Sequence, residues 1–190
     1  MKLFTKNMVS HSCILLVKSE LDKLHIPYIN VDLGEIEIDG ALTAELYQQA
    51  RQAMQNLGFD ILESNQKILT EKIKNIIVEV VHYTEDELKF KFSDYLSSKL
   101  NLHYTYLNYV FFKEQGMSIK KYFIAQKIER VKKLITYQEL NLTEIAFKTH
   151  YSSIAHLSNQ FKKMTGFSPS NYKKLNDKMR LPLEQVGLVA

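Results

Sequence analysis

The sequence lacks the features of secreted and membrane-spanning chains. Its 190 residues include a single cysteine, which excludes a framework of intrachain disulfides and fits a reducing compartment. No run of about 18 apolar residues occurs, so no membrane span is expected. A signal peptide is not expected either, because Lys18, Glu20, Asp22 and Lys23 follow the N-terminus too soon. We therefore expect a cytoplasmic protein with no membrane partner.

Common catalytic signatures are also missing. The sequence contains no Gly-rich phosphate loop, no H-E-x-x-H and no G-x-S-x-G motif. Cys13 and His11 stand two positions apart, and on a helix such side chains point in different directions. With no nucleophile-base pair, the sequence predicts a protein that is not an enzyme.

Charge is distributed unevenly along the chain. Residues 1–65 carry five Lys/Arg against nine Asp/Glu, whereas residues 85–175 carry fifteen against eight. An acidic front and a basic back indicate two modules, the second suited to a polyanion such as nucleic acid. A charge excess of this size can also serve solubility alone.

The first 65 residues have the pattern β-α-β-β-α-β. Alternating or short apolar runs predict strands, 3.6-residue periodicity predicts helices, and Thr43 is placed to cap the second helix. This order predicts an α+β fold that opens with a ferredoxin-like βαββαβ sandwich. The expected strands cover 2–6, 28–33, 35–39 and 59–63, and the helices 12–24 and 43–56.

The remaining chain is predicted to be helical. One amphipathic helix is expected from residue 66 to about 83, followed by a polar break at 84–87. We accordingly expect four parts: a domain at 1–65, a connecting helix and break at 66–86, an all-α domain at 87–175, and a flexible tail at 176–190.

The all-α part contains a repeat of 50 residues. The spacing L-x3-F-x-K-x2-G-x-S-x3-Y occurs twice, and its Gly and Ser are not ordinary core choices. The Gly is expected to end one helix and the Ser to cap the next. The matched pairs are Leu107/Leu157, Phe111/Phe161, Lys113/Lys163, Gly116/Gly166, Ser118/Ser168 and Tyr122/Tyr172.

Each copy follows a short helix and a tight turn, the arrangement of a helix-turn-helix. In the first copy Ser93 is expected to cap a helix to residue 100, and a second helix spans 104–115. In the second copy Asn141 and Glu144 form a capping-box pattern, and Ser152 or Ser153 starts a helix at 154–165. A long helix at 118–137 joins the copies.

The second copy resembles the signature of AraC/XylS-type transcription regulators. The resemblance rests on Ile145-Ala146, Tyr151-Ser152-Ser153 and the run L-S-N-Q-F-K-K-M-T-G-F-S-P-S-N-Y at 157–172. It implies a seven-helix DNA-binding domain with two helix-turn-helix units in successive major-groove segments. His150 stands where the family usually has Gly, Tyr151 and Leu157 where it has Phe, and Lys173 where it has Arg.

The resemblance also implies site residues. Neither reading face carries Arg, so bidentate guanine contacts should matter less, while Asn can read adenine and Ala or Ile can contact a thymine methyl. Leu107, Phe111, Leu157 and Phe161 are expected in the core. The base-reading candidates are Tyr104, Thr105, Asn108, Tyr109, Ile154, Ala155, His156 and Asn159, and the phosphate-contact candidates are Lys113, Ser153, Lys162, Lys163 and Lys173.

The front domain resembles a heavy-metal-associated domain, whose first loop carries M-x-C-x-x-C and chelates a soft ion. Met8 and Cys13 match this motif, but Ser10 occupies the first Cys position. Soft ions prefer paired thiolates, so the remaining candidate ligands are His11 and Cys13. A lone cysteine at a helix start also occurs as an ordinary packed residue.

The leading prediction is a sequence-specific, AraC/XylS-type transcription regulator without a cofactor. Its front domain would be a sensor, dimerisation or partner module. The implied partners are double-stranded DNA, a second copy of the chain and the transcription machinery. The alternative is a soft-metal carrier, or a metal- or redox-responsive protein, that uses Cys13.

Overall fold

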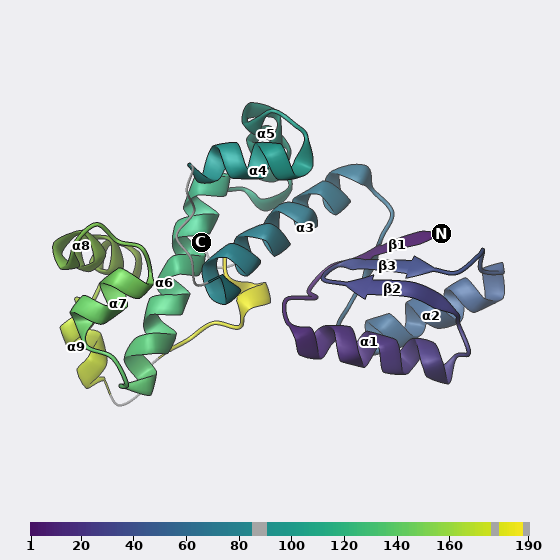
Figure 1. The fold of residues 1–190 in the computed structure, drawn as a ribbon, viewed down its shortest axis with the longest axis horizontal. Helices are drawn as coiled ribbons and strands as arrows, with labels where there is room; N and C mark the ends of the chain where they lie inside the picture. Colours follow the sequence, from purple (N-terminus) through teal and green to yellow (C-terminus); the bar gives the residue numbers. More distant parts are fainter. Residues whose placement is uncertain (85–90, 176–178, 188–190) are drawn as a thin grey trace. The chain divides into compact units, whose positions relative to one another are not determined.

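A computed structural model describes residues 1–84, 91–175 and 179–187 (Figure 1). The chain divides into two units, one made of Met1–Ile76 and Thr105–Glu114, the other of Ile77–Tyr104 and Gln115–Ala190. Part of the predicted polar break, residues 85–87, lies outside the described residues.

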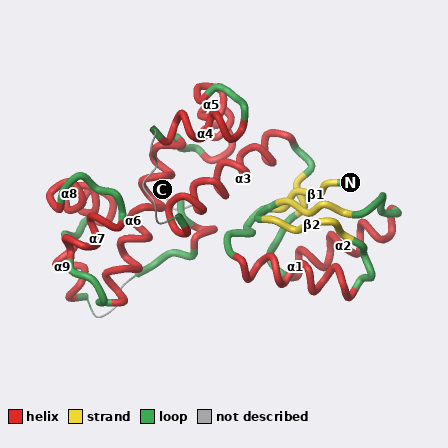
Figure 2. Tube along the Cα trace, viewed as in Figure 1, coloured by secondary structure: helices red, strands yellow, loops and turns green. Residues whose placement is uncertain are grey.

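A four-stranded sheet forms the centre of the first unit (Figure 2). The strands lie in the order β2-β3-β1-β4, and each neighbouring pair is antiparallel. The observed β-α-β-β-α-β order confirms the predicted sequence of elements. The bounds are β1 Lys2–Thr5, α1 His11–Lys23, β2 Tyr28–Asp32, β3 Glu35–Ile38, α2 Ala44–Asn56 and β4 Ile61–Leu62.

Strand alternation explains which face of the sheet is covered. In β3 Ile36 and Ile38 are fully buried, while Glu35 and Glu37 lie on the opposite face. The buried residues of α1 and α2, Val17 and Met54 among them, belong to the same core cluster. The Thr43 hydroxyl accepts a hydrogen bond from the Leu46 amide and starts α2, as predicted.

Helix α3, Asn65–Val78, meets the opposite side of this sheet. Lys72 Nζ lies 4.6 Å from the centroid of the Phe4 ring and 3.4 Å from a Glu35 carboxylate oxygen. Asn75 Nδ2 donates to the Leu33 carbonyl at 3.0 Å. Gly34 forms the β2–β3 turn with φ of +77°, and a Cβ there would collide with Asn75. Any larger residue here would adopt a strained backbone conformation and would displace the Asn75 side chain from its present position.

The connecting helix continues beyond α3 as a π-helical turn, Glu79–Tyr83. The predicted single helix is thus present, with a wider last turn that periodicity alone does not reveal. Within the second unit this turn packs on α6, Ile119–Tyr137. A His82 ring nitrogen lies 2.9 Å from Gln126 Oε1, and Arg130 donates to the Val81 carbonyl.

The remaining helices follow the predicted repeat. One detail was wrong: Ser93 does not cap the first short helix, because it lies inside α4 and its hydroxyl donates to Asp94, with Lys91 at the N-cap. The bounds are α4 Phe92–Leu100, α5 Tyr104–Gln115, α7 Leu142–Lys148, α8 Ile154–Thr165 and α9 Pro169–Lys174, followed by a 3-10 turn at Leu183–Gln185.

The described part of the C-terminal tail packs on α6, which differs from the flexible tail expected for 176–190. The Leu181 amide donates to Glu129 Oε2 at 3.1 Å, and Gln126 Nε2 donates to the Leu183 carbonyl at 3.1 Å. Val186 is buried. Backbone groups of Leu181 and Leu183 are thus paired with polar side chains of α6.

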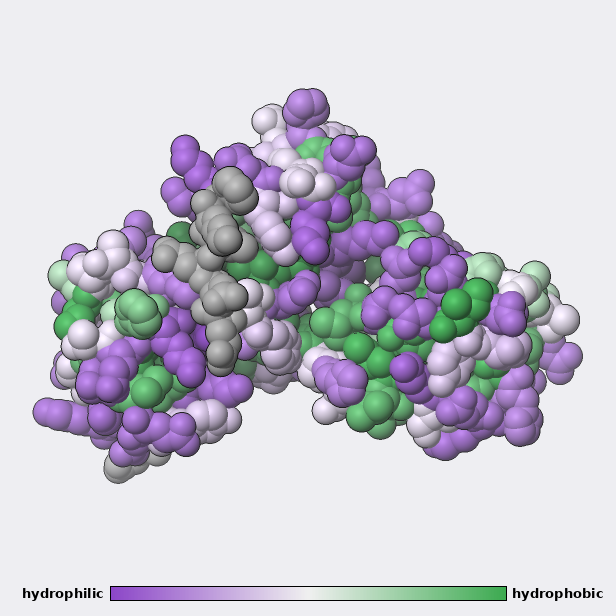
Figure 3. All heavy atoms as spheres, viewed as in Figure 1, coloured by the Kyte–Doolittle hydropathy of each residue, from purple (hydrophilic) through white to green (hydrophobic). Residues whose placement is uncertain are grey.

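Among the described residues, no helix is both long and apolar enough to cross a membrane. The first unit nevertheless exposes apolar side chains over α1, where Figure 3 shows them on the viewed face, and Leu15 and Leu16 are half exposed.

Candidate nucleic-acid interface

Helices α7 and α8 form a sharply capped pair in the second unit. Asn141 Oδ1 accepts from the Thr143 and Glu144 amides, and Glu144 Oε2 accepts from the Asn141 amide at 2.7 Å, which completes the predicted capping box. Ser153, rather than Ser152, caps α8 by accepting from the His156 amide at 3.0 Å. His150 turns the chain between the helices with φ of +54°, as the family's usual glycine implies.

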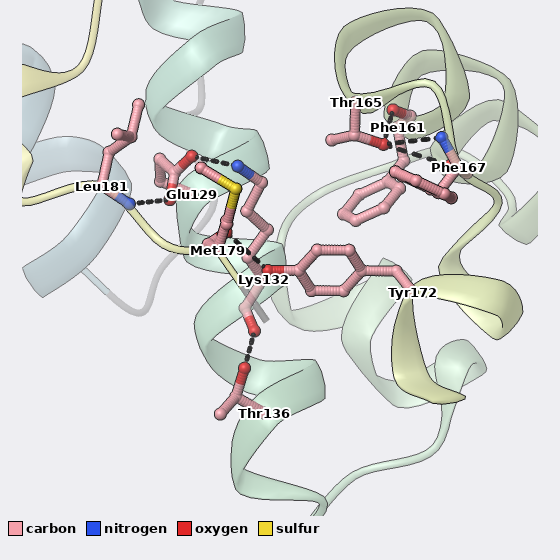
Figure 4. Close-up of polar contacts among 9 residues, drawn as sticks. All are labelled: Glu129, Lys132, Thr136, Phe161, Thr165, Phe167, Tyr172, Met179 and Leu181. Carbon is pink, nitrogen blue, oxygen red and sulfur yellow. Dashed lines mark hydrogen bonds and ion pairs between the residues drawn. The ribbon is translucent and has the colours of Figure 1, made fainter. Parts of the chain in front are cut away.

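A cluster of apolar and aromatic residues holds α8 in place. Leu157 and Phe161 point inward and are fully buried, and Ile145 and Ala146 of α7 belong to the same cluster. The Phe161 and Tyr172 rings meet edge to face with centroids 5.3 Å apart. Figure 4 shows the Tyr172 hydroxyl donating to the Met179 carbonyl, and Leu181 donating to Glu129. The inward face of α8 is therefore committed to packing.

The outward face of α8 carries the predicted reading residues. Ile154, Ala155, His156 and Asn159 are all exposed. His156 is held in place from two sides: its Nδ1 lies 3.0 Å from Ser152 Oγ, and its ring meets that of Tyr151 at a right angle. Its Nε2 is left for an external acceptor or donor. The sequence did not single out Ser152 for this role, although its position four residues before His156 is a usable signal.

Exposed basic groups lie at the end of α8 and on α9. The predicted phosphate contacts Lys162 and Lys163 lie exposed in the last turn of α8, and Lys173 lies exposed on α9. Ser153 uses its oxygen as the helix cap, which leaves its hydroxyl proton available to a phosphate. No carboxylate occurs in α8.

The first copy places its residues in the same way. Asn101 ends α4 in the left-handed region, and α5 begins at Tyr104. Leu107 and Phe111 are fully buried, as predicted. Among the candidates, Thr105 and Tyr109 are exposed, Tyr104 and Asn108 are half-buried, and Lys113 Nζ donates to Gln66 Oε1 at 3.4 Å. Burial raises the pKa of Tyr104, which therefore stays a neutral donor.

The repeat is confirmed in backbone geometry. Gly116 and Gly166 follow α5 and α8 with φ of +69° and +80°. Two residues later Ser118 and Ser168 each accept a hydrogen bond at 3.2 Å from the third helical amide, from Lys121 and Asn171.

This arrangement agrees with a match between residues 96–175 and the model of a helix-turn-helix domain family. Residues 96–175 form a helix-turn-helix domain. The match supports the resemblance to AraC/XylS-type regulators for the C-terminal half, and the relatives described next agree with the expectation of a non-enzymatic protein.

The chain is similar in sequence to two proteins named as regulators. The chain is 26% identical over 149 residues to the Msm operon regulatory protein of Streptococcus mutans, covering 78% of this chain and 52% of that protein. It is 26% identical over 102 residues to the HTH-type transcriptional regulator YtdP of Bacillus subtilis, covering 53% of this chain and 13% of the relative. The chain thus spans about half or less of these relatives' lengths.

A solved structure shares the fold. The C-terminal domain of AraT, a response regulator from Geobacillus stearothermophilus, aligns with a TM-score of 0.51 and 23% identity. The alignment covers 63% of this chain and 92% of that domain. At this level of identity the likeness shows the fold of the helix-turn-helix domain alone.

Within the helix-turn-helix domain, Tyr151 carries a buried hydroxyl without a partner among the described residues. Burial raises the pKa of Tyr151 to about 12, so the group stays protonated. Lys127 Nζ lies 4.0 Å from the centroid of the Tyr151 ring and donates to the neighbouring His150 carbonyl. The Tyr151 ring thus makes a favourable contact with Lys127, whereas burying its unpaired hydroxyl lowers the stability of the folded domain.

Replacing Tyr151 with Phe should stabilise the domain. The substitution keeps the ring contacts with Lys127 and His156 and removes a buried hydroxyl, so we expect a gain of about 1 kcal/mol in the free energy of unfolding. Urea denaturation of the two proteins measures the difference. A loss of stability would show that the hydroxyl has a favourable interaction in the folded protein.

In the second candidate site, around Cys13, side chains of the loop contact neighbouring protein groups. Met8 is fully buried and its sulfur accepts a hydrogen bond from Thr5 Oγ1 at 2.8 Å. Cys13 Sγ lies 3.3 Å from Ser10 Oγ, and His11 is exposed. Among the described residues, no three His, Cys, Asp or Glu side chains gather to hold a metal ion. The geometry thus offers no ligand set around the predicted pair.

Proposed function

We propose that the protein is a sequence-specific DNA-binding transcription regulator of the AraC/XylS type. The observation that carries the proposal is α8: its inner face is fully packed, while its outer face presents His156 and Asn159 beside Lys162 and Lys163. A capped helix that is held by its inner face, and that presents polar and basic side chains on its outer face, suits the major groove of DNA. Two relatives named as regulators support the same function.

The exposed residues divide into two roles in this proposal. Asn159, at the centre of the outer face, reads adenine through its two-ended amide, and His156 supplies one further polar contact through Nε2. The phosphate contacts, Lys113, Ser153, Lys162, Lys163 and Lys173, fix orientation and make the affinity depend on salt. Tyr104, Thr105, Asn108 and Tyr109 of α5, with Ile154 and Ala155 of α8, complete the reading set.

The front domain is proposed as a sensor, dimerisation or partner module with a ferredoxin-like fold. The antiparallel order β2-β3-β1-β4, with two helices on one face, supports this fold. Its relation to heavy-metal-associated domains remains a resemblance of the loop around Met8 and Cys13. Since a DNA-binding regulator works where the chromosomal DNA is, we place the protein in the cytoplasm.

Genomic fragments titrated at two salt concentrations test this function. One fragment class should be preferred, and Asn159→Ala should weaken binding to it about tenfold or more without changing the salt dependence. Lys162→Ala should lower the slope of log affinity against log salt by about 1, whereas the matched control Lys67→Ala, an exposed lysine of α3, should leave it unchanged. The proposal fails if no fragment is preferred and the affinity has no salt slope.

A further inference from the structure

The outward face of α5 is aromatic. Tyr109 is 63% exposed and Phe112 57% exposed, and Tyr106 is nearly as open. Thr105, Tyr109 and Phe112 stand four and then three residues apart, so they form one stripe along the helix, opposite the buried Leu107 and Phe111. Large rings gathered on one exposed stripe indicate a contact surface rather than a solvated face. Phe112 was not among the predicted reading residues, although the seven-residue spacing from Thr105 points to it.

The repeat gives each of these rings a counterpart on α8. A shift of 50 residues brings Tyr109 onto Asn159 and Phe112 onto Lys162. These two outward positions are therefore aromatic on α5 and polar or basic on α8. On α5 the charge of Lys113 is followed by Glu114, whereas α8 carries two lysines and no carboxylate. At these two positions the helices therefore offer different chemistry to a base edge.

We infer that Tyr109 and Phe112 read thymine methyl groups in the DNA that faces α5. This inference rests on the proposed DNA-binding function. The C5 methyl of thymine is the apolar feature of the major groove, and it is recognised by apolar side chains. The adjoining Lys113 supplies the phosphate contact that sets the depth of the helix.

Uracil substitution in the preferred DNA fragment isolates the methyl group. Replacing one thymidine at a time with deoxyuridine removes the C5 methyl and keeps the base pair. For the full chain at fixed salt we expect affinity to be about three- to fivefold weaker at one or two positions, which corresponds to the free energy of burying one methyl group. Phe112→Ala and Tyr109→Ala should each weaken binding to the thymine-containing fragment and abolish the uracil penalty at one of those positions.

Two controls distinguish the loss of thymine recognition by α5 from a general loss of structure or affinity. Asn159→Ala should weaken binding but keep the uracil penalty, because its contacts are made by α8. The Tm of Phe112→Ala should match that of the unmodified protein, since the ring is exposed.

Three outcomes overturn the inference. Uracil can be neutral at every position, the penalty can persist in both α5 variants, or both variants can bind the fragment as well as the unmodified protein does. The last result would show that the aromatic stripe does not contribute to DNA binding. In each case Asn159→Ala still reports on the proposed function, which fails separately if no fragment is preferred.

Discussion

Replacing Phe161 with Ala should destabilise the helix-turn-helix domain by about 3–5 kcal/mol, the usual cost of removing a buried aromatic ring. Phe161 is 0% exposed and lies between Leu157 and Tyr172 in the core cluster beneath α8. The substitution would leave a cavity and would also remove the edge-to-face contact between Phe161 and Tyr172. Urea denaturation followed by circular dichroism measures the loss.

The chain supplies its own matched control for this substitution. Phe147 stands on α7 and is 84% exposed, so Phe147→Ala should change the free energy of unfolding by no more than about 0.5 kcal/mol. Comparable losses for the two variants would contradict the assignment of Phe161 to the core and Phe147 to the surface.

Acid should weaken the packing of the π-helical turn on α6 through His82. Burial, ahead of the nearby charges of Arg130, Lys133 and Arg180, lowers the pKa of His82 from 6.5 to about 4. Above pH 6.5 the ring is neutral in both folded and unfolded chains, so its contribution to stability is fully present. As the pH falls towards 4 the unfolded chain gains a proton that the folded chain does not, and stability should fall by about 3 kcal/mol.

His82→Gln provides the comparison, because glutamine does not titrate and keeps an amide that can bond to Gln126. Carboxylates titrate in both proteins, so the informative quantity is the difference in unfolding free energy between them at pH 7, 5.5 and 4.5. As the pH falls, the free energy of unfolding of His82→Gln should rise relative to that of the unmodified protein. Parallel curves would show that the ring is not held neutral in the folded chain.

Local patterns in the sequence predicted most of the elements and the inward residues of the repeat. Strand alternation, Thr43, the Asn141–Glu144 box and the Gly–Ser pairs act within a few residues, so their effects can be read from neighbouring positions. The turn at His150 was expected at positive φ from the family resemblance, and it is there.

Features that depend on distant segments were missed. The hydrogen bonds that join Leu181 and Leu183 to α6 involve partners more than fifty residues away, which no local pattern specifies. The π-helical turn, which packs on α6, was likewise not visible in the periodicity. Ser93 was misplaced because a serine can lie within a first turn as well as cap it. The reading residues on α5 and α8 stay predictions, with their exposure now known.

Polar side chains in the middle of α6 fix how the π-helical turn and the C-terminal segment align along this helix. Gln126 meets His82 and Leu183, Glu129 meets Leu181, and Arg130 meets Val81. Apolar side chains alone would tolerate a slide of one helical turn, about 5.4 Å, because one methyl group replaces another at little cost. These directional bonds would all break in such a slide and leave buried polar groups unpaired. Gln126, Glu129 and Arg130 thus select one alignment among several that the apolar contacts would permit.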